Sequence, residues 1–327
     1  MEQNQAYWKY MQGLTPFRLA PYFRTRIWGF NDLSPWFDYK TDGEPIGEVW
    51  LTGEMCAAET GPLQGQSLKD ITDAHGEALL GKGGAGQEFP LLIKILFPKE
   101  KLSVQVHPDA AMAQKYGEPR GKTECWYALD AQPGAEVALG IKPGTRPEQV
   151  RAAIEGSTLE GLLNLVPVNK GDMIFVDAGT VHAVLPGAVL LETQQTSDLT
   201  YRMYDYGRPR ELHLDKSMEA MRLSTGAGKR LPKSVNGHSI LIDEKYFRME
   251  CWSLQSGAAT LSSETASADV VQLVFLADGN LKIEGDGFEA FSLGRCQLAV
   301  IPAGAKNWRI STESAADVMR ILPKSAN

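Results

Sequence analysis

The 327-residue sequence lacks the features that mark several large classes of protein. It has no run of basic residues and a net charge of −7, so nucleic acid and anionic membrane surfaces are poor candidates as partners. No stretch approaches the roughly 20 apolar residues that a membrane-spanning helix needs. The first 14 residues contain no apolar run of signal-peptide length, so we expect a cytoplasmic protein. A small anionic ligand stays compatible with this composition, because it needs only a few local Lys or Arg residues.

Cysteine is scarce, with four residues in the whole chain and no CxxC pair. This excludes a disulfide framework and a cysteine-rich zinc site, and we expect reduced thiols. Disorder is excluded as well, because 43% of the residues are hydrophobic and aromatic residues are spread along the chain. The length suffices for one large domain or two ordinary ones.

Short strand-like runs separated by Gly, Pro, Asp and Asn dominate the sequence, which favours a sandwich or barrel over βαβ units. The predicted strands are Gly47–Thr52, Leu91–Leu96, Leu102–His107, Cys125–Ala128, Glu136–Leu139, Met173–Val176, Val189–Gln194, Phe247–Leu254, Val270–Ala277 and Gln297–Ile301. Helical patterns are few. They cover Ser67–Leu80, two short helices broken near Gly156 within Arg146–Leu165, and His213–Met221.

A small, basic stretch at Ser224–Lys233 is typical of a linker. A faint repeat crosses it, because residues 171–179 (GDMIFVDAG) and 294–304 (GRCQLAVIPAG) share a strand followed by an Ala-Gly turn. Only the first copy continues to a histidine. We therefore predict a catalytic domain over residues 1–224 and a related β domain without that chemistry over residues 234–327.

Ligand-type side chains stand on or beside three of the predicted strands. Gln105 and His107 are two residues apart, so they share one strand face, while Glu124 and His182 would come from neighbouring strands. Imidazole nitrogen and carboxylate oxygen are ligands that zinc and similar divalent ions take. A single histidine on a strand is more often structural than a ligand, so the spacing alone leaves a metal site and an ordinary strand both open.

The motifs around these residues resemble those of type I phosphomannose isomerases, in particular the short bacterial members. L-S-V-Q-V-H-P-D is followed by G-K-T-E-C-W-Y, then D-A-G-T-V-H-A, then E-T-Q-Q-T-S-D-L-T-Y-R-M-Y-D-Y-G-R. P-I-G-E-V-W, ending at Trp50, also fits the family. The resemblance covers residues 20 to 222 with specific motifs and the remainder loosely.

The resemblance implies a mainly β fold: a cupin double-stranded β-barrel (jelly roll) with inserted short helices, and a second, degenerate cupin-like barrel at the C-terminus. It implies one Zn²⁺ ion per chain with four ligands, Gln105, His107, Glu124 and His182. Arg202 matches the active-site arginine of the family and Lys122 matches an active-site lysine. The implied activity is a zinc-dependent aldose–ketose isomerisation between mannose 6-phosphate and fructose 6-phosphate, in carbohydrate metabolism.

Such a reaction moves a proton between C1 and C2 through an enediol or enediolate, whose negative charge a metal ion stabilises. The sequence leaves the proton-transferring base open among Lys122, Glu48 and a metal-bound water. Glu48 is also a candidate for binding substrate. Arg202 stays protonated, so we assign it to binding or polarising a substrate oxygen, with an ion pair to Asp198 or Asp205 as the structural alternative.

Arg208 and Arg210 are candidate donors to the substrate phosphate, with a solvated loop as the alternative. Two other functions stay open from the sequence. A cupin iron dioxygenase would use a similar ligand set, and a non-catalytic sugar-phosphate sensor would bind without turnover. The sequence does not indicate the oligomeric state.

Overall fold

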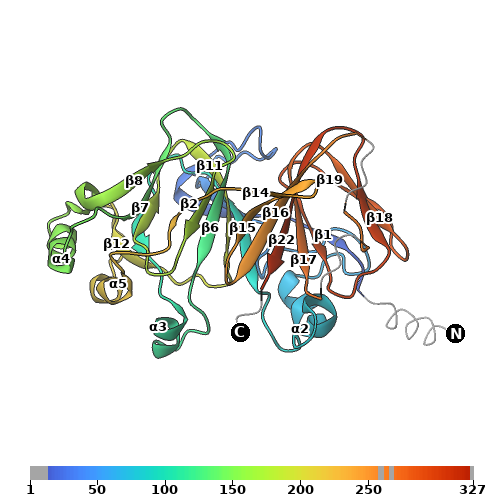
Figure 1. The fold of residues 1–327 in the computed structure, drawn as a ribbon, viewed down its shortest axis with the longest axis horizontal. Coiled ribbons are helices and arrows are strands. Elements are labelled where there is room, and N and C mark those ends of the chain that lie inside the picture. Colours follow the sequence, from blue (N-terminus) through green and yellow to red (C-terminus); the bar gives the residue numbers. More distant parts are fainter. Residues whose placement is uncertain (1–13, 257–260, 265–268, 325–327) are drawn as a thin grey trace. The chain divides into compact units, whose positions relative to one another are not determined.

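The structure, a computed structural model, describes residues 14–256, 261–264 and 269–324. The chain forms two compact units (Figure 1). We call residues 23–50 and 91–231 the first unit. The second unit comprises residues up to 22, residues 51–90 and residues from 232 onward. The predicted mainly β fold with a few short helices is confirmed.

The first unit contains two sheets, which Figure 1 shows around β6, β7 and β11. In order across the larger sheet, the strands are β13 (Gly228–Arg230), β9 (Met173–Val176), β6 (Glu124–Ala131), β11 (Ala188–Gln195), β4 (Leu91–Leu96), β3 (Ile46–Trp50) and β2 (Tyr22–Phe30). The smaller sheet runs β12 (Tyr201–Tyr204), β5 (Val104–Val106), β10 (His182–Val184), β7 (Glu136–Ile141) and β8 (Leu163–Pro167).

The inner faces of these two sheets share one hydrophobic core. Trp126 and Leu190 from the larger sheet and Val137 and Val184 from the smaller sheet belong to the same buried cluster. Burying such side chains stabilises the folded chain by about 25 cal/mol for each Å² of apolar surface removed from water. The two-sheet arrangement is that of the predicted cupin-like barrel.

Short helices cover the outer face of the smaller sheet (Figure 1). Val150 and Ile154 of α4 (Pro147–Glu155) pack in one cluster with Val104 and Ala138 of the sheet. The remaining helices of this unit are α3 (Ala110–Lys115), the 3-10 helix η1 (Leu159–Leu162) and α5 (Leu214–Ala220). The predicted α4 ends at Gly156 as expected.

Two sequence predictions in this unit are wrong. The second helix expected before Leu165 is a single 3-10 turn, after which the chain pairs with β7 as β8, because apolar Leu163 is buried at that sheet edge. The expected linker Ser224–Lys233 contains β13, which pairs with β9, and the first residue of β14 (Lys233–Val235). Small and basic residues at a sheet edge look like a linker, because an edge strand has few buried positions.

The second unit repeats the arrangement with a seven-stranded and a three-stranded sheet. The larger sheet runs β1 (Phe17–Leu19), β20 (Leu298–Ile301), β17 (Gln272–Asp278), β22 (Ala316–Pro323), β16 (Phe247–Leu254), β15 (His238–Asp243) and β14. The smaller sheet runs β19 (Phe291–Leu293), β18 (Leu281–Gly285) and β21 (Trp308–Ser311). Helix α2 (Leu68–Leu80) also belongs here, and Ser67 caps it by accepting a hydrogen bond from the Asp70 backbone N–H at 3.1 Å.

The two larger sheets have corresponding strand orders. The two strands of the sequence repeat, β9 and β20, each lie second from one edge. Each then neighbours a long central strand, β6 or β17. The structure therefore gives the faint sequence repeat a topological counterpart.

The predicted domain boundary between residues 224 and 234 lies close to the observed change of unit at residue 232. Residues 51–90 group with the second unit, which a linear division of the chain does not anticipate. The division of the chain into two domains stays a prediction. Among the described residues, no helix is long and apolar enough to cross a membrane.

Candidate functional site

Three strands of the first unit bring the predicted metal ligands together. His182 on β10 lies directly opposite Gln105 on β5, and Arg202 on β12 lies opposite Gln105 on its other side. Directly opposed residues of paired strands point to the same face of a sheet. His107, two residues after Gln105, follows the end of β5 on the same face. Glu124 comes from β6 of the facing sheet.

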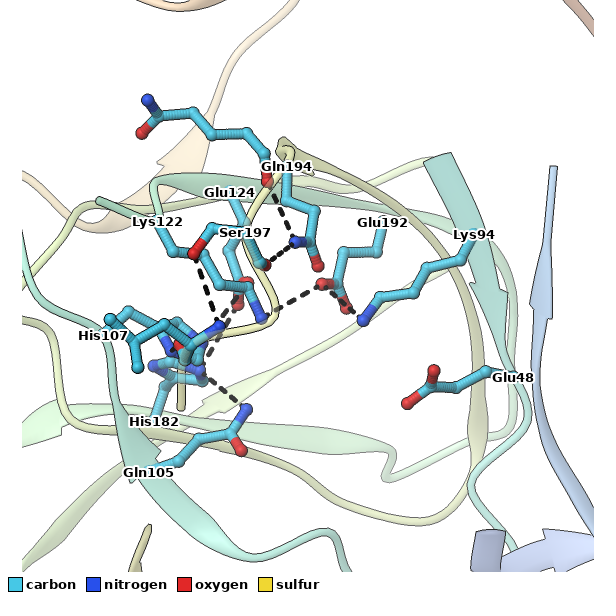
Figure 2. A network of polar contacts seen from close by, with 12 residues as sticks. Glu48, Lys94, Gln105, His107, Lys122, Glu124, His182, Glu192, Gln194 and Ser197 are labelled. Atoms are coloured by element: carbon cyan, nitrogen blue, oxygen red, sulfur yellow. Dashed lines mark hydrogen bonds and ion pairs between the residues drawn. The ribbon is translucent and has the colours of Figure 1, made fainter. Parts of the chain in front are cut away.

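The side chains of His107, Glu124 and His182 meet in the barrel interior (Figure 2). One ligand atom of each lies within 4.8 Å of the others, and each residue is 1% exposed. His182 Nε2 lies 3.3 Å from Glu124 Oε1, and His107 Nε2 lies 3.5 Å from Glu124 Oε2. Among the residues that the structure describes, this is the single group of three such ligands.

Backbone carbonyls fix the orientation of both imidazoles. His107 Nδ1 donates to the Leu199 carbonyl and His182 Nδ1 donates to the Thr180 carbonyl, each at 2.9 Å. A carbonyl only accepts, so the Nε2 atom of each neutral ring carries the lone pair that faces Glu124. Burial lowers the pKa of His182 to about 4 and lowers the pKa of His107 well below its usual value. Both rings are therefore neutral at pH 7, as metal ligation requires.

Gln105 stands beside this group. Its Nε2 atom lies 3.2 Å from His182 Nε2. Rotating the side-chain amide by 180° exchanges its nitrogen and oxygen, so Oε1 can take that place. An amide oxygen adds a ligand without adding charge. Hereafter the metal group means His107, Glu124, His182 and Gln105.

The donor set fits a divalent metal ion such as zinc. His107 Nε2 is buried without a hydrogen-bond partner, and Glu124 Oε2 is buried with no hydrogen bond beside its ion pair to Lys122. Such burial is costly for groups that have no further role. Two imidazole nitrogens, one carboxylate and one amide oxygen are a ligand set that zinc accepts. A zinc ion held by these groups would keep a net positive charge, because only one ligand is anionic.

A row of buried charges extends from the metal group across the larger sheet (Figure 2). Lys122 Nζ lies 3.3 Å from Glu124 Oε2 and 3.9 Å from Glu192 Oε1. Glu192 in turn pairs with Lys94, at 3.2 Å. Charges of opposite sign alternate along this row, which compensates their loss of hydration.

Sequence analysis missed Lys94 and Glu192. Lys94 sits in an otherwise apolar strand, L-L-I-K-I-L, and Glu192 is the only charged residue of A-V-L-L-E-T-Q-Q. The register places the two residues opposite one another. A lone charge within a fully buried strand was the signal that could have found them, because such a charge needs a buried partner. Burial, followed by the charge of Glu124, raises the pKa of Glu192 to about 7.

Glu48 lies on the far side of Lys94 from the metal group (Figure 2). Its carboxylate accepts two hydrogen bonds from Arg26, both at 3.0 Å, and one from Trp50 Nε1 at 2.8 Å. Burial alone would raise the pKa of Glu48, but the charges of Lys94 and Arg26 lower it to about 2. These contacts favour a structural carboxylate. Its predicted role in substrate binding or proton transfer stays a prediction.

Glu48→Gln is expected to lower the free energy of unfolding by about 3 kcal/mol at pH 6 and by about half as much at pH 3. The folded-state pKa lies below the usual 4.5, so the ionised carboxylate stabilises the protein above pH 4.5. This contribution is lost as the pH falls toward 2. Urea unfolding of wild type and Glu48→Gln at pH 6 and at pH 3 measures this contribution. A difference in the free energy of unfolding that stays constant with pH would contradict the lowered pKa of Glu48.

Arg202 lies on β12, and Arg208 and Arg210 lie in the loop that follows this strand. Within the described part of the chain, Arg202 pairs with neither Asp198 nor Asp205, the two partners of the structural alternative. Asp205 instead accepts hydrogen bonds from Arg208 and Arg210. Arg202 Nη1 donates to the Glu211 carbonyl at 2.9 Å, and its Nε is buried without a hydrogen-bond partner.

Comparisons with known proteins agree with this geometry. The family model for phosphomannose isomerase type I, catalytic domain, matches residues 16–143. A mannose-6-phosphate isomerase of Streptococcus mutans is 33% identical over 90% of this chain and 94% of its own length. A probable mannose-6-phosphate isomerase of Bacillus subtilis, GmuF, is 36% identical over 76% of this chain and 83% of its own.

A solved structure extends the likeness to the fold. The mannose 6-phosphate isomerase of Bacillus subtilis superposes with a TM-score of 0.82 at 30% sequence identity. The superposition covers 94% of this chain and 99% of that one. It therefore includes both units and not only the residues around the metal group.

Proposed function

This chain belongs to the type I phosphomannose isomerases, and we propose that it interconverts mannose 6-phosphate and fructose 6-phosphate at one zinc ion per chain. The observation that carries the proposal is the buried metal group, with its two oriented imidazoles and one carboxylate. It stands in a barrel interior that also holds a buried lysine.

The metal group would hold the ion, and zinc would supply Lewis-acid stabilisation of the negative oxygen of an enediolate. Arg202 lies on the same sheet face as Gln105 and is protonated at neutral pH. Its guanidinium is suited to binding a substrate oxygen on that face. This gives it the predicted role of an oxyanion donor, since its buried Nε has no hydrogen-bond partner.

Lys122 is the residue we favour for moving the proton between C1 and C2. It would first pass its own ammonium proton to Glu192, and the free amine would then take the proton from one carbon and return it to the other. Lys122 is 4% exposed, and its Nζ lies between the carboxylates of Glu124 and Glu192. A buried side chain at this place excludes bulk water from the transferred proton. Glu48 is less suited, because its carboxylate already accepts three hydrogen bonds.

The phosphate of the substrate requires donors away from the metal group. Arg208, with a side chain that is 18% exposed, stands in the loop that follows Arg202 and β12. A planar guanidinium suits a phosphate group. We assign Arg208 to phosphate binding.

Removal and restoration of zinc tests the proposed function. Purified protein should convert mannose 6-phosphate to fructose 6-phosphate, lose turnover after treatment with a chelator, and regain it with zinc. Oxygen consumption with bound iron would replace the proposal with a dioxygenase. Tight sugar-phosphate binding without turnover, at a full complement of zinc, would replace it with a sensor.

A further inference from the structure

One buried carboxylate holds both arginines of the loop that follows β12. Asp205 is 2% exposed. Its Oδ1 accepts from Arg208 Nη2 at 2.6 Å and from Arg210 Nη2 at 2.7 Å, and its Oδ2 accepts from Arg210 Nε at 2.6 Å. Arg208 Nε adds a contact to Oδ1 at 3.1 Å. Charge-assisted hydrogen bonds of this kind fix the planes of both guanidinium groups.

The backbone turn at D-Y-G-R brings these side chains together. The Arg208 N–H donates to the Asp205 carbonyl at 3.0 Å, and the two central residues have positive φ. The φ of Tyr206 is 56° and that of Gly207 is 79°, as a type I′ turn requires. Gly207 adopts this conformation without a side-chain clash, whereas Tyr206 pays a steric cost for it. The surrounding contacts must therefore hold the turn.

Hydrogen bonds hold this loop against β12, the strand that carries Arg202. The Arg202 N–H donates to His213 Nδ1 at 3.1 Å, and the His213 N–H donates back to the Arg202 carbonyl at 2.8 Å. Arg208 Nη2 also donates to the Lys101 carbonyl at 2.9 Å. These contacts fix the loop beside Arg202, the residue that opposes Gln105 of the metal group.

The loop carries more positive charge than Asp205 neutralises. Arg208 and Arg210 share the single negative charge of Asp205, and Arg202 lies close enough to feel their charges without pairing with that carboxylate. Burial, with the charges of Arg210 and Arg208, lowers the pKa of Arg202, although Asp205 opposes this. The Glu211 side chain is 83% exposed and can turn to water. An added anion would compensate this excess charge.

The geometry leaves one edge of each held guanidinium for such an anion. Both arginines direct their Nε–Nη2 edge to Asp205. Within the described part of the chain, neither Nη1 atom has a hydrogen-bond partner. The side chains of Arg208 and Arg210 are 18% and 29% exposed, so a ligand can reach them.

We propose that Asp205 is a positioning residue that presents Arg208 and Arg210 as a two-arginine clamp for the phosphate monoester of the substrate. The clamp sets the preference for phosphorylated over unphosphorylated aldoses. Arg210 thereby joins Arg208 as a phosphate donor. This inference rests on the proposed isomerase function, because it names the part of the same site that binds phosphate.

Asp205→Asn is expected to raise KM for mannose 6-phosphate by about 10- to 100-fold, the effect of one or two charge-assisted hydrogen bonds, with kcat within about threefold of wild type. The affinity for inorganic phosphate, measured by calorimetry on the full-length protein, should fall by a similar factor. A purely structural role would not produce this split between KM and kcat. A fall in kcat with unchanged KM and phosphate affinity would overturn the proposal.

Glu250→Gln is the matched control. Glu250 is a buried carboxylate of the second unit that also binds two arginines, with Arg248 Nε at 2.7 Å and Arg320 Nε at 2.8 Å. Its substitution should lower thermal stability as Asp205→Asn does, yet leave KM and phosphate affinity unchanged. An equal loss of phosphate affinity in Glu250→Gln would overturn the proposal, because general destabilisation would then explain the effect.

Arg210→Lys keeps the charge and removes the planar donor pair, so it tests the clamp even if Asp205→Asn does not fold. It should weaken phosphate binding by about tenfold. Phosphate binding measured by calorimetry also separates the clamp from the proposed isomerase function. Wild type that lacks turnover but binds phosphate with an affinity that falls in Asp205→Asn would support the clamp and refute the isomerase. Turnover without phosphate binding would do the reverse.

Discussion

Replacing His182 by alanine is expected to abolish turnover and to remove the bound metal together. Its Nε2 faces Glu124 at 3.3 Å and its Nδ1 is held by the Thr180 carbonyl, so the substitution removes one of the two oriented imidazoles of the metal group. Loss of Lewis-acid stabilisation, worth several kcal/mol, should lower kcat/KM by at least about a thousandfold. Metal analysis of the purified variant, together with the isomerase assay, measures both effects.

His75→Ala provides the matched control for the loss of a histidine. His75 lies in α2 of the second unit, at the kink inside that helix. This variant should keep wild-type metal content and activity. Thermal unfolding of His182→Ala shows whether the variant is folded. If folded His182→Ala retained metal and turnover, the assignment of the metal group would be wrong.

Lys122→Met is expected to lower kcat by about 100- to 10,000-fold while the bound metal is retained, since this is the range of positioned acid–base catalysis. Methionine matches the length and apolar stem of the lysine, and the metal ligands keep their own backbone contacts. The variant leaves Glu192 paired with Lys94 alone. Steady-state kinetics and metal analysis of the same preparation separate the two properties.

The control for this variant is Lys282→Met, which removes an exposed lysine of β18 that pairs with Glu284. It should leave kcat and metal content unchanged. If Lys122→Met lost its metal along with activity, Lys122 would instead act by holding the Glu124 carboxylate. If its kcat stayed near wild type, another residue would have to move the proton.

The two units show why similar sheets differ in chemistry. Glu124 on β6 pairs in register with Val176 on β9, and Gln272 on β17 pairs with Ile301 on β20. The corresponding strand orders therefore place Gln272 where the first unit has its carboxylate ligand. Six residues after Val176 the chain reaches His182, whereas six residues after Ile301 it reaches Asn307. An amide at either place cannot supply the anionic or imidazole ligands of the metal group.

Local sequence determined most of the strands and helices of this protein and predicted its metal ligands. Alternation along Leu102–His107 placed Gln105 and His107 on one face, because side chains of a strand alternate with a period of two. Ser67 marked the start of α2, because capping depends on residues within one turn. The resemblance to the isomerase family, carried by contiguous motifs, supplied Glu124, His182, Lys122 and Arg202.

Only the tertiary structure decided which charges meet. Lys94 and Glu192 are nearly 100 residues apart in the chain, and their pairing depends on β4 and β11 being neighbours in one register. The Asp205 carboxylate could have bound Arg202, yet a turn with two positive φ values directs it to Arg208 and Arg210. Strand order, register and turn geometry arise from packing of the whole chain, and short-range sequence patterns do not encode them.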